Sequence, residues 1–315
     1  MKFKSRYFGI IGIVVLVYIL FTIDLPRVFT ILRSTNIYYL IIAVLVNPVV
    51  ILLLTIRWKY IIRIIGGDIK FRSCLLLRLK GVFLGNITPG RIGDLYRAKH
   101  LSEEGNLDLA KSFSSVIIDR ILDIFALIFL NIVGLYLLMY IFEVKAFLIE
   151  SILFSLLILI CLFFIVKKNL MRKLLRPLYK IFVPSDAKEK VVIHFYEFYN
   201  GLAKMKGKNY LLSFLVSIFV WIITYLGIYL LALSLDISVS LIFIIAMAPV
   251  ASFLSALPIS VGGLGTREAI YVFFLSSIDI EPEYAVALAL MVFIFLNLIY
   301  LPFGIATYLV SGDKK

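Results

Sequence analysis

Charged residues are scarce in this sequence. Asp, Glu, Lys and Arg make up 16% of the 315 residues, whereas hydrophobic residues make up 63%. A soluble domain is about a quarter charged, and a disordered chain is poor in large apolar residues, so the composition excludes both classes. Acids are scarcer than bases, 19 against 32, which leaves a net charge of +13. A chain this apolar is not expected to bind nucleic acid, although it is basic. We therefore expect a polytopic, all-helical membrane protein.

Cysteine and histidine are also nearly absent. The two cysteines, Cys74 and Cys161, lie far apart in apolar stretches, and the two histidines, His100 and His194, are isolated. This spacing excludes a disulfide framework and gives no support to a zinc site. We therefore expect no metal and no cofactor.

Six apolar runs are long enough to cross a hydrocarbon core of about 30 Å. They lie at about 7–23, 37–56, 117–142, 147–166, 210–233 and 284–310. The first run follows a basic N-terminus, but the small residues of a cleavage site do not come after it. We therefore interpret it as an uncleaved first span.

The basic residues gather in two segments between these runs. Segment 57–72 has five bases and one acid, and segment 167–209 has eleven bases and three acids. The positive-inside rule places both segments, and both termini, in the cytoplasm of a multi-pass cell-membrane protein. Only Arg27 and Arg33 contradict this orientation, because they fall in a predicted outside loop.

Two other apolar stretches, 73–95 and 237–278, are interrupted by Pro, Gly and charge. The charge-based topology works only if each stretch enters and leaves the membrane on the same side. We therefore predict two re-entrant hairpins, the first entering from the cytoplasm and the second from outside. The alternative is that Pro and Gly merely kink two spanning helices.

The two stretches resemble each other in sequence. Pro89-x-x-x-Gly93-Asp94-Leu95 matches Pro258-x-x-x-Gly262-Gly263-Leu264 at an offset of 169, and each is followed by an arginine, Arg97 or Arg267. Gly134 and Gly304 fall at nearly the same relative place in the next span. Because charge counting gives the two units opposite directions, the pattern predicts an inverted-topology repeat, in which broken helices meet near the midplane and form a substrate site.

Irregular backbone at membrane depth is tolerated only against protein or a wet cavity, so we expect a polar cavity at the hairpins. In the first hairpin the candidate binding residues are Asn86, Arg91, Asp94 and Arg97, with structural breaks at Pro89, Gly90 and Gly93. In the second they are Ser260, Gly262, Gly263, Arg267 and Glu268, with breaks at Pro258 and Gly265. Arg97 is one helical turn after Asp94, so the two can pair when the site is empty. Backbone N–H groups at a helix start after the second turn favour an anion such as phosphate.

A third charged group, Asp119-Arg120-x-x-Asp123, opens a long apolar run. Asp119 and Asp123 share one helix face, and charges at membrane depth should face the interior and find partners. We therefore add all three residues to the candidate binding site. The alternative is that they lie at the interface and only extend their polar ends to water.

The basic segment 167–209 predicts two helices. Leucines at helical spacing opposite basic residues over 170–182 indicate an amphipathic interfacial helix, and 187–204 is a second candidate. Such a segment could concentrate anionic lipid beside the site. A solvated loop that only obeys the positive-inside rule explains the composition equally well.

Together these motifs resemble the lysylphosphatidylglycerol synthase transmembrane-region family, also called flippase-like or UPF0104. The resemblance rests on three ordered motifs: the Gly85–Arg97 stretch, Asp119-Arg120-x-x-Asp123, and the Leu257–Glu268 stretch. It implies a single domain over 1–315, with a first half at about 1–142 containing the hairpin 73–97, and a second half at about 210–310. In relatives such a domain is fused to an aminoacyl-transferase or glycosyltransferase domain. Here we expect a stand-alone membrane domain.

The resemblance implies translocation or binding of a lipid rather than aminoacyl transfer. The expected partners are membrane lipids, either an anionic phospholipid or a polyprenyl-phosphate lipid, and a lipid-modifying enzyme is a further candidate. A membrane enzyme with a carboxylate as general base is an alternative, although we find no metal-binding Asp pair, no nucleophile with a histidine base and no nucleotide-binding loop. The residues also allow an ion-coupled transporter of small solutes.

Overall fold

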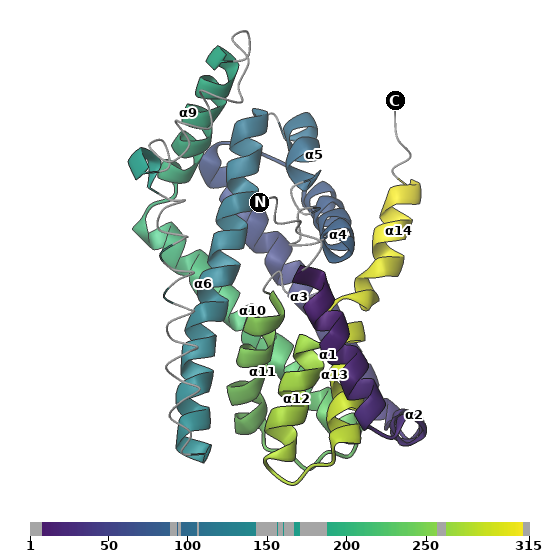
Figure 1. Cartoon of the computed structure of the whole chain (residues 1–315). Helices are drawn as coiled ribbons and strands as arrows, with labels where there is room; N and C mark the ends of the chain where they lie inside the picture. The colour runs from purple at the N-terminus through teal and green to yellow at the C-terminus, as the bar shows by residue number, and fades with distance from the viewer. Residues whose placement is uncertain are drawn as a thin grey trace.

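Figure 1 shows the protein as a computed structural model that is built from helices. The structure describes residues 8–88, 93, 96–105, 107–142, 156, 160, 167–170, 188–256 and 263–310. In these ranges the helices are α1 (Phe8–Thr22), α2 (Leu25–Arg33), α3 (Ile37–Ile65), α4 (Phe71–Ile87), α5 (Tyr96–Glu104), α6 (Leu109–Phe142), α9 (Lys188–Lys204), α10 (Gly207–Ser234), α11 (Leu241–Ala256), α12 (Thr266–Ser276), α13 (Pro282–Leu296), the 3₁₀ helix η4 (Leu298–Tyr300) and α14 (Leu301–Val310).

Four stretches of the described chain are long and apolar enough to cross a membrane. They are Ile37–Ile65, Leu109–Ile141, Gly207–Ser234 and Pro282–Thr307, and they confirm four of the six predicted spans. The predicted first span forms α1, which has 15 residues and is therefore about 22 Å long. The predicted span 147–166 lies outside the described residues except for positions 156 and 160.

Two of these helices extend beyond their predicted bounds. α6 begins at Leu109, eight residues before the predicted start at 117. α3 continues to Ile65, where Gly66 ends it with a positive φ of 103°, as is common at helix C-termini. Residues 57–65 are therefore helical, and Arg57 is buried within the bundle rather than lying in a cytoplasmic segment. Charge counting missed this because it does not distinguish an arginine on a buried helix face from one in a loop.

Two pairs of short helices occupy the predicted hairpins. α4 packs against α5, and α11 packs against α12. The second helix of each pair has only 9 or 11 residues, whereas a spanning helix needs about 20. In Figure 1 the α4–α5 pair lies in the upper part of the bundle and the α11–α12 pair in the lower part.

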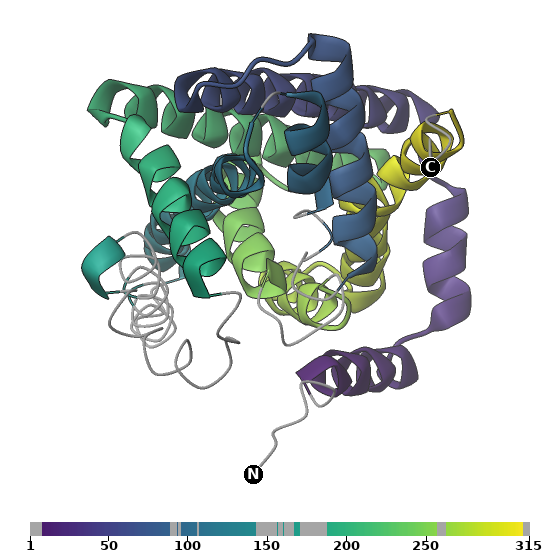
Figure 2. The same cartoon turned by 90° about the horizontal axis from the view of Figure 1, so that it is seen from above.

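Helix packing in the two halves is reciprocal. α11 packs on α6 of the first half, and α14 packs on α4. α5 packs on α6 as α12 packs on α13, and α3 contacts α4 as α10 contacts α11. The long helices α3 and α10 pack against each other, and Figure 2 shows them side by side along one edge of the molecule.

The two glycines that sequence comparison paired lie at these reciprocal contacts. A Cβ added at Gly134 of α6 would be 2.4 Å from the carbonyl oxygen of Ala246 in α11. A Cβ added at Gly304 of α14 would be 2.3 Å from Cβ of Phe83 in α4. Gly134 thus permits a close approach between α6 and α11, and Gly304 between α14 and α4.

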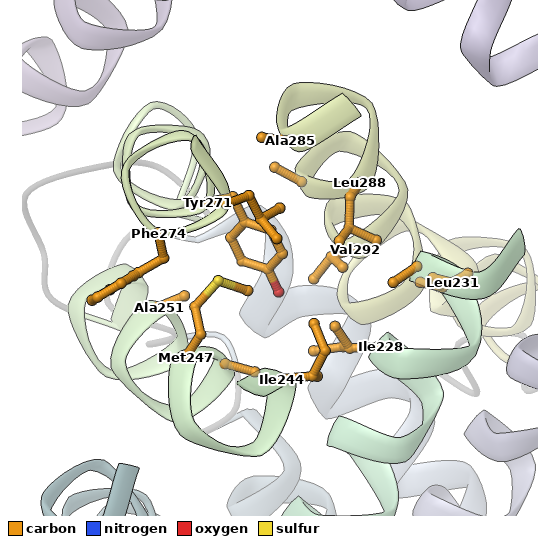
Figure 3. Close-up of a cluster of buried hydrophobic side chains, with 14 of the residues drawn as sticks. Ile228, Leu231, Ile244, Met247, Ala251, Tyr271, Phe274, Ala285, Leu288 and Val292 are labelled. Atoms are coloured by element: carbon orange, nitrogen blue, oxygen red, sulfur yellow. The ribbon is translucent and has the colours of Figure 1, made fainter. Parts of the chain in front are cut away.

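The two halves have different cores. α10, α11, α12 and α13 surround a largely apolar cluster in which Tyr271, Met247 and Leu288 point toward one another (Figure 3). The first half has an apolar cluster around Trp58 and Ile62, formed largely by α3, α5, α6 and α9. Its neighbouring buried positions include three arginines and an aspartate, so buried charge is concentrated in the first half.

The two ends of the bundle carry different charges. One end contains α9, which confirms the second predicted helix of the basic segment. Lys204 Nζ of α9 donates to the Ile65 carbonyl oxygen of α3 at 2.5 Å, and Glu197 of α9 pairs with Lys111 of α6 at 2.9 Å. At the other end Arg27 pairs with Glu281, and the Asp24 N–H donates to Glu283. Arg27, which contradicted the positive-inside pattern, is therefore neutralised by an acid from the opposite half of the chain.

Candidate functional site

A fully buried carboxylate, Asp119 of α6, is the centre of the candidate site. Arg78 Nη1 and Arg97 Nη2 each donate to Asp119 Oδ2 at 2.7 Å, and Arg57 Nη2 donates to Oδ1 at 2.6 Å. These arginines come from α4, α5 and α3. One carboxylate therefore connects four helices, and we call Arg57, Arg78, Arg97, Asp119 and Asp123 the Asp119 cluster.

Arg57 connects the Asp119 cluster to Asp123 and, through Ser217, to α10. Arg57 Nη1 donates to Asp123 Oδ1 at 2.5 Å and also to the hydroxyl of Ser217. Arg120 lies farther from Asp123, at 3.9 Å, and their side chains are 22% and 18% exposed. Asp119 and Asp123 share a helix face, as predicted.

The Asp119 carboxylate does not extend to water, as the interfacial alternative would require. Its side chain has no exposed surface, and it lies ten residues after the first residue of α6. That separation is about 15 Å along the helix. Asp119 therefore belongs to the interior, where the arginines replace the water that an interfacial carboxylate would contact.

Trp58 forms one wall of the cluster. The Arg97 guanidinium carbon lies 4.5 Å from the centre of the indole ring, and that of Arg78 lies at 6.0 Å. The indole N–H donates to the Ser115 hydroxyl at 3.3 Å. Such cation–π contacts attract the arginine side chains to the indole face in a desolvated site.

Sequence reasoning missed two members of the cluster, Arg57 and Arg78. Charge counting places Arg57 in the cytoplasmic segment 57–72, and the candidate residues of the first hairpin begin at Asn86, after Arg78. An ionisable residue within a membrane segment is by itself a candidate for function. Arg78 follows Cys-Leu-Leu-Leu in the sequence, so this rule alone would have found it.

Arginine is in excess in the cluster. Three arginines contribute +3 and two aspartates −2, which leaves +1. Arg78 Nε has no hydrogen-bond partner in the described part of the chain.

Arg267 and Glu268 form a second, smaller polar site at the start of α12. The positive φ values of Gly263 and Gly265, 83° and 84°, form the turn that opens the helix, as the sequence predicted. The Gly265 N–H donates to Glu268 Oε2 at 2.5 Å, while Oε1 lacks a hydrogen-bond partner among the described residues. Both side chains are buried, and the Arg267 guanidinium lies 5.7 Å from the ring centre of Phe293.

The structure describes only part of the predicted hairpin tips. Gly93 approaches the helix before it, because an added Cβ would be 2.3 Å from the Leu84 carbonyl oxygen. Asn86 lies in the last turn of α4. The remaining predicted residues lie outside the described residues: Arg91, Asp94, Ser260 and Gly262, and the breaks Pro89, Gly90 and Pro258. In the described ranges, no group of three or more His, Cys, Asp or Glu is placed to hold a metal ion.

Comparison with known proteins gives a consistent family. The sequence pattern of the family described as "Lysylphosphatidylglycerol synthase TM region" matches residues 9–304. A UPF0104 membrane protein of Methanocaldococcus jannaschii is 31% identical over 301 residues, covering 91% of this chain and 89% of the relative. A UPF0104 membrane protein of Methanothermobacter thermautotrophicus is 26% identical over 314 residues, with the same coverage. One of Pyrococcus horikoshii is 24% identical over 309 residues, covering 91% of each chain. With its long apolar helices, this chain is a multi-pass membrane protein that belongs to the lysylphosphatidylglycerol synthase transmembrane-region family.

Proposed function

We propose that this protein translocates an anionic lipid between the leaflets of the membrane. The observation that carries the proposal is the Asp119 cluster, in which three buried arginines surround one buried carboxylate inside a membrane-spanning bundle. The lipid is an anionic phospholipid or a polyprenyl-phosphate lipid. Its phosphate binds between the two short helix pairs, while its acyl chains stay in the hydrocarbon.

The charge balance of the cluster supports an anionic headgroup. Arginine binds phosphate through paired N–H donors, and these bonds are strongest where water is excluded. The described cluster brings three arginines around two aspartates. A further carboxylate of the chain pairs with these arginines when the site is empty, and the lipid phosphate takes its place when the site is loaded. Asp94, three residues before Arg97, is the carboxylate proposed for this exchange.

The reciprocal packing of the halves supports an inverted-topology repeat. α4 of the first pair packs on α14 of the second half, and α11 of the second pair packs on α6 of the first half. In transporters with inverted repeats, broken helices from both halves meet at a site that alternates between the two sides. We propose that the two pairs are re-entrant hairpins of this kind.

The proposed site draws residues from both hairpins. Arg91, Arg97 and Arg267, with backbone N–H groups at the start of α12, contact the phosphate. Asn86, Ser260, Gly262 and Gly263 line the same cavity. Asp94, Asp119, Asp123 and Glu268 pair with the arginines when no lipid is bound, or carry protons, and Arg120 lies at the margin.

The orientation follows from the ends of the bundle. The end formed by α9 and the start of α6 carries exposed bases such as Lys206 and Lys208, whereas the opposite end carries Asp236, Asp279 and Glu283. The positive-inside rule places the basic end in the cytoplasm. Both termini are then cytoplasmic.

Reconstitution into liposomes tests the proposal. Purified protein is incorporated into vesicles that contain a fluorescent phosphatidylglycerol, and an impermeant reductant reports how fast dye moves from the inner to the outer leaflet. The expected result is faster exchange than in protein-free vesicles, with unchanged lipid mass. A modified lipid product would show that the protein is a membrane enzyme rather than a translocase. Exchange no faster than in protein-free vesicles would contradict the proposed translocation.

Arg267→Gln is the informative variant, with Arg63→Gln as its control. Arg267 is buried at the start of α12, whereas the Arg63 side chain is 64% exposed at the far end of α3. We expect Arg267→Gln to reduce the exchange rate at least tenfold, a change of about 1.4 kcal/mol, and Arg63→Gln to leave it unchanged. Full activity of a folded Arg267→Gln protein would show that the proposed anion site is wrong.

A further inference from the structure

Glu268 of α12 is a buried carboxylate that uses one of its two oxygens. Oε2 accepts from the Gly265 N–H at 2.5 Å, at the start of the helix. Oε1 has no hydrogen-bond partner in the part of the chain that the structure describes, and the residue is 0% exposed. Oε1 can therefore carry a proton without breaking a hydrogen bond that the structure shows.

The aspartates of the Asp119 cluster differ from Glu268 in this respect. Both oxygens of Asp119 accept from arginines at 2.6–2.7 Å, and Asp123 Oδ1 accepts from Arg57 at 2.5 Å. Protonating either aspartate would weaken a charge-assisted hydrogen bond, and these are the strongest that a side chain makes. Of these three carboxylates, Glu268 is therefore the best suited to gain and lose a proton.

Few other titratable groups lie around Glu268 among the described residues. α12 packs against α1, α11 and α13, and α11 contains no titratable side chain. Those of α1 and α13 are Tyr18, which is 67% exposed, and Glu283 and Tyr284, which lie beside the far end of α12. Within α12, Tyr271 points into the apolar cluster (Figure 3), and Arg267 supplies the positive charge that acts on Glu268.

Arg267 lies beside a second hydroxyl-bearing residue at the turn before α12. A Cβ added at Gly263 would be 3.0 Å from Arg267 Nη2 and 3.0 Å from the Ser255 hydroxyl oxygen of α11. Both groups therefore lie against the same glycine. The Ser255 hydroxyl is buried and has no hydrogen-bond partner among the described residues, so it is free to donate to a phosphate oxygen that approaches Arg267.

A phosphate at Arg267 would change which form of Glu268 is favoured. A nearby positive charge favours a carboxylate, whereas a nearby negative charge favours the neutral acid. The phosphate neutralises Arg267 and places a negative charge beside Glu268, so both effects favour protonation. Because such coupling is reciprocal, a proton on Glu268 strengthens phosphate binding by the same factor.

We infer that Glu268 takes up one proton when a lipid phosphate binds at Arg267, and that the protein moves the anionic lipid together with this proton. The inference rests on the proposed function and names its coupling ion. The proton comes from water, bonds to Oε1 and returns to water when the lipid leaves. The phosphodiester adds one negative charge and the proton one positive charge, so the loaded and empty sites carry the same net charge. A pH gradient, rather than the membrane potential, then drives the lipid.

Calorimetric titration tests the inference. The detergent-purified protein is titrated with dihexanoyl phosphatidylglycerol at the same pH in HEPES and in Tris, which release protons with different heats. The difference between the two binding heats counts the protons. We expect about one proton taken up per bound lipid at some pH between about 5 and 9, and over that range an affinity that falls about tenfold per pH unit.

Two variants assign the proton. Glu268→Gln keeps a side-chain oxygen for the Gly265 N–H but cannot titrate, so it should bind the lipid without proton uptake and with an affinity independent of pH. Asp279→Asn is the control, because Asp279 is an exposed acid beyond the other end of α12, and asparagine tolerates its positive φ of 61°. This variant should keep the uptake of the unsubstituted protein.

The outcomes separate the inference from the proposed function. Lipid binding without proton uptake at every pH would overturn the inference alone, and the unsubstituted protein decides this even if Glu268→Gln does not fold. Proton uptake that persists in Glu268→Gln would also overturn it. Proton-coupled binding by a protein that does not exchange the fluorescent lipid would support the proton site and contradict translocation. No binding of the lipid would overturn both.

Discussion

At Asp119 the sequence places a carboxylate where three arginines from three different helices reach it. A buried ion pair gains little over apolar packing, but removing one partner leaves the others without compensation. Asp119 has no exposed surface and accepts from Arg57, Arg78 and Arg97. Asp123 accepts from Arg57 and keeps 18% of its side chain exposed. The two carboxylates share a helix face, but Asp119 compensates three buried arginines whereas Asp123 compensates one.

This difference predicts unequal effects of neutralising them. Asp119→Asn leaves three buried cations with one fewer anion and should destabilise the protein by about 3–5 kcal/mol, as for a broken buried pair. Asp123→Asn should cost about 1 kcal/mol, because water can approach that site. Thermal unfolding of the detergent-purified variants, followed by the loss of monodisperse protein, measures both. Similar unfolding temperatures for the two variants would contradict the central role of Asp119.

Arg57 should not be replaceable by lysine. Its guanidinium donates from Nε, Nη1 and Nη2 to Asp119, Asp123 and Ser217, and an ammonium group cannot reproduce that planar set. We expect Arg57→Lys to lower stability by about 2 kcal/mol or more through lost charge-assisted hydrogen bonds.

Arg63→Lys is the matched control, because Arg63 is about 1.7 turns farther along α3 and mostly exposed. The free energy of unfolding of this variant should lie within about 0.5 kcal/mol of that of the unsubstituted protein, as is usual for surface substitutions. Thermal unfolding measures both variants, and equal stability of the two would show that the shape of the Arg57 side chain does not matter.

At the scale of helices, close glycine contacts hold the two halves together. A Cβ at Gly134 would be 2.4 Å from a backbone oxygen of α11, which cannot move aside as a flexible side chain can. Gly134→Ala should therefore separate α6 from α11 locally and destabilise the protein by about 1–3 kcal/mol, the usual range for overpacking.

Gly207 at the start of α10 provides the control for this prediction. An added Cβ there meets nothing within 4 Å, so Gly207→Ala should be neutral or stabilise the helix by up to about 1 kcal/mol. Thermal unfolding distinguishes the two variants. A Gly134→Ala protein as stable as the Gly207→Ala protein would mean that α6 and α11 do not pack as closely as the structure shows.

At the scale of the whole molecule, the charge asymmetry predicts the orientation. Ser277, at the α12 end that faces Arg27 and Glu281, and Lys208, at the α9 end, lie at opposite ends of the bundle and are exposed. In a background with Cys161→Ser, where the remaining Cys74 is buried, an impermeant thiol reagent should label Ser277→Cys in intact cells. Lys208→Cys should react only after the membrane is opened. The opposite pattern would invert the proposed topology.

The sequence predicted the spans better than the contacts. Long apolar runs identify helices that must satisfy their backbone hydrogen bonds internally in lipid. Four predicted spans were therefore confirmed as helices, although α3 and α6 are longer than predicted. Helix ends were less predictable. The charge of Arg57 indicates a loop residue, and its burial is evident only once α3 is known to continue to Ile65. The motif around Asp119 identified a charged helix face, but not the arginines opposite it.

The sequence by itself determined that this chain is helical and membrane-embedded, because the density of apolar residues and the clustering of bases depend only on local composition. It also determined that Gly263 and Gly265 precede a helix, because a turn there depends on neighbouring residues. Only the tertiary structure decided which charges meet. Arg57, Arg78 and Arg97 lie 62, 41 and 22 positions from Asp119, and ion pairing over such separations depends on how helices pack.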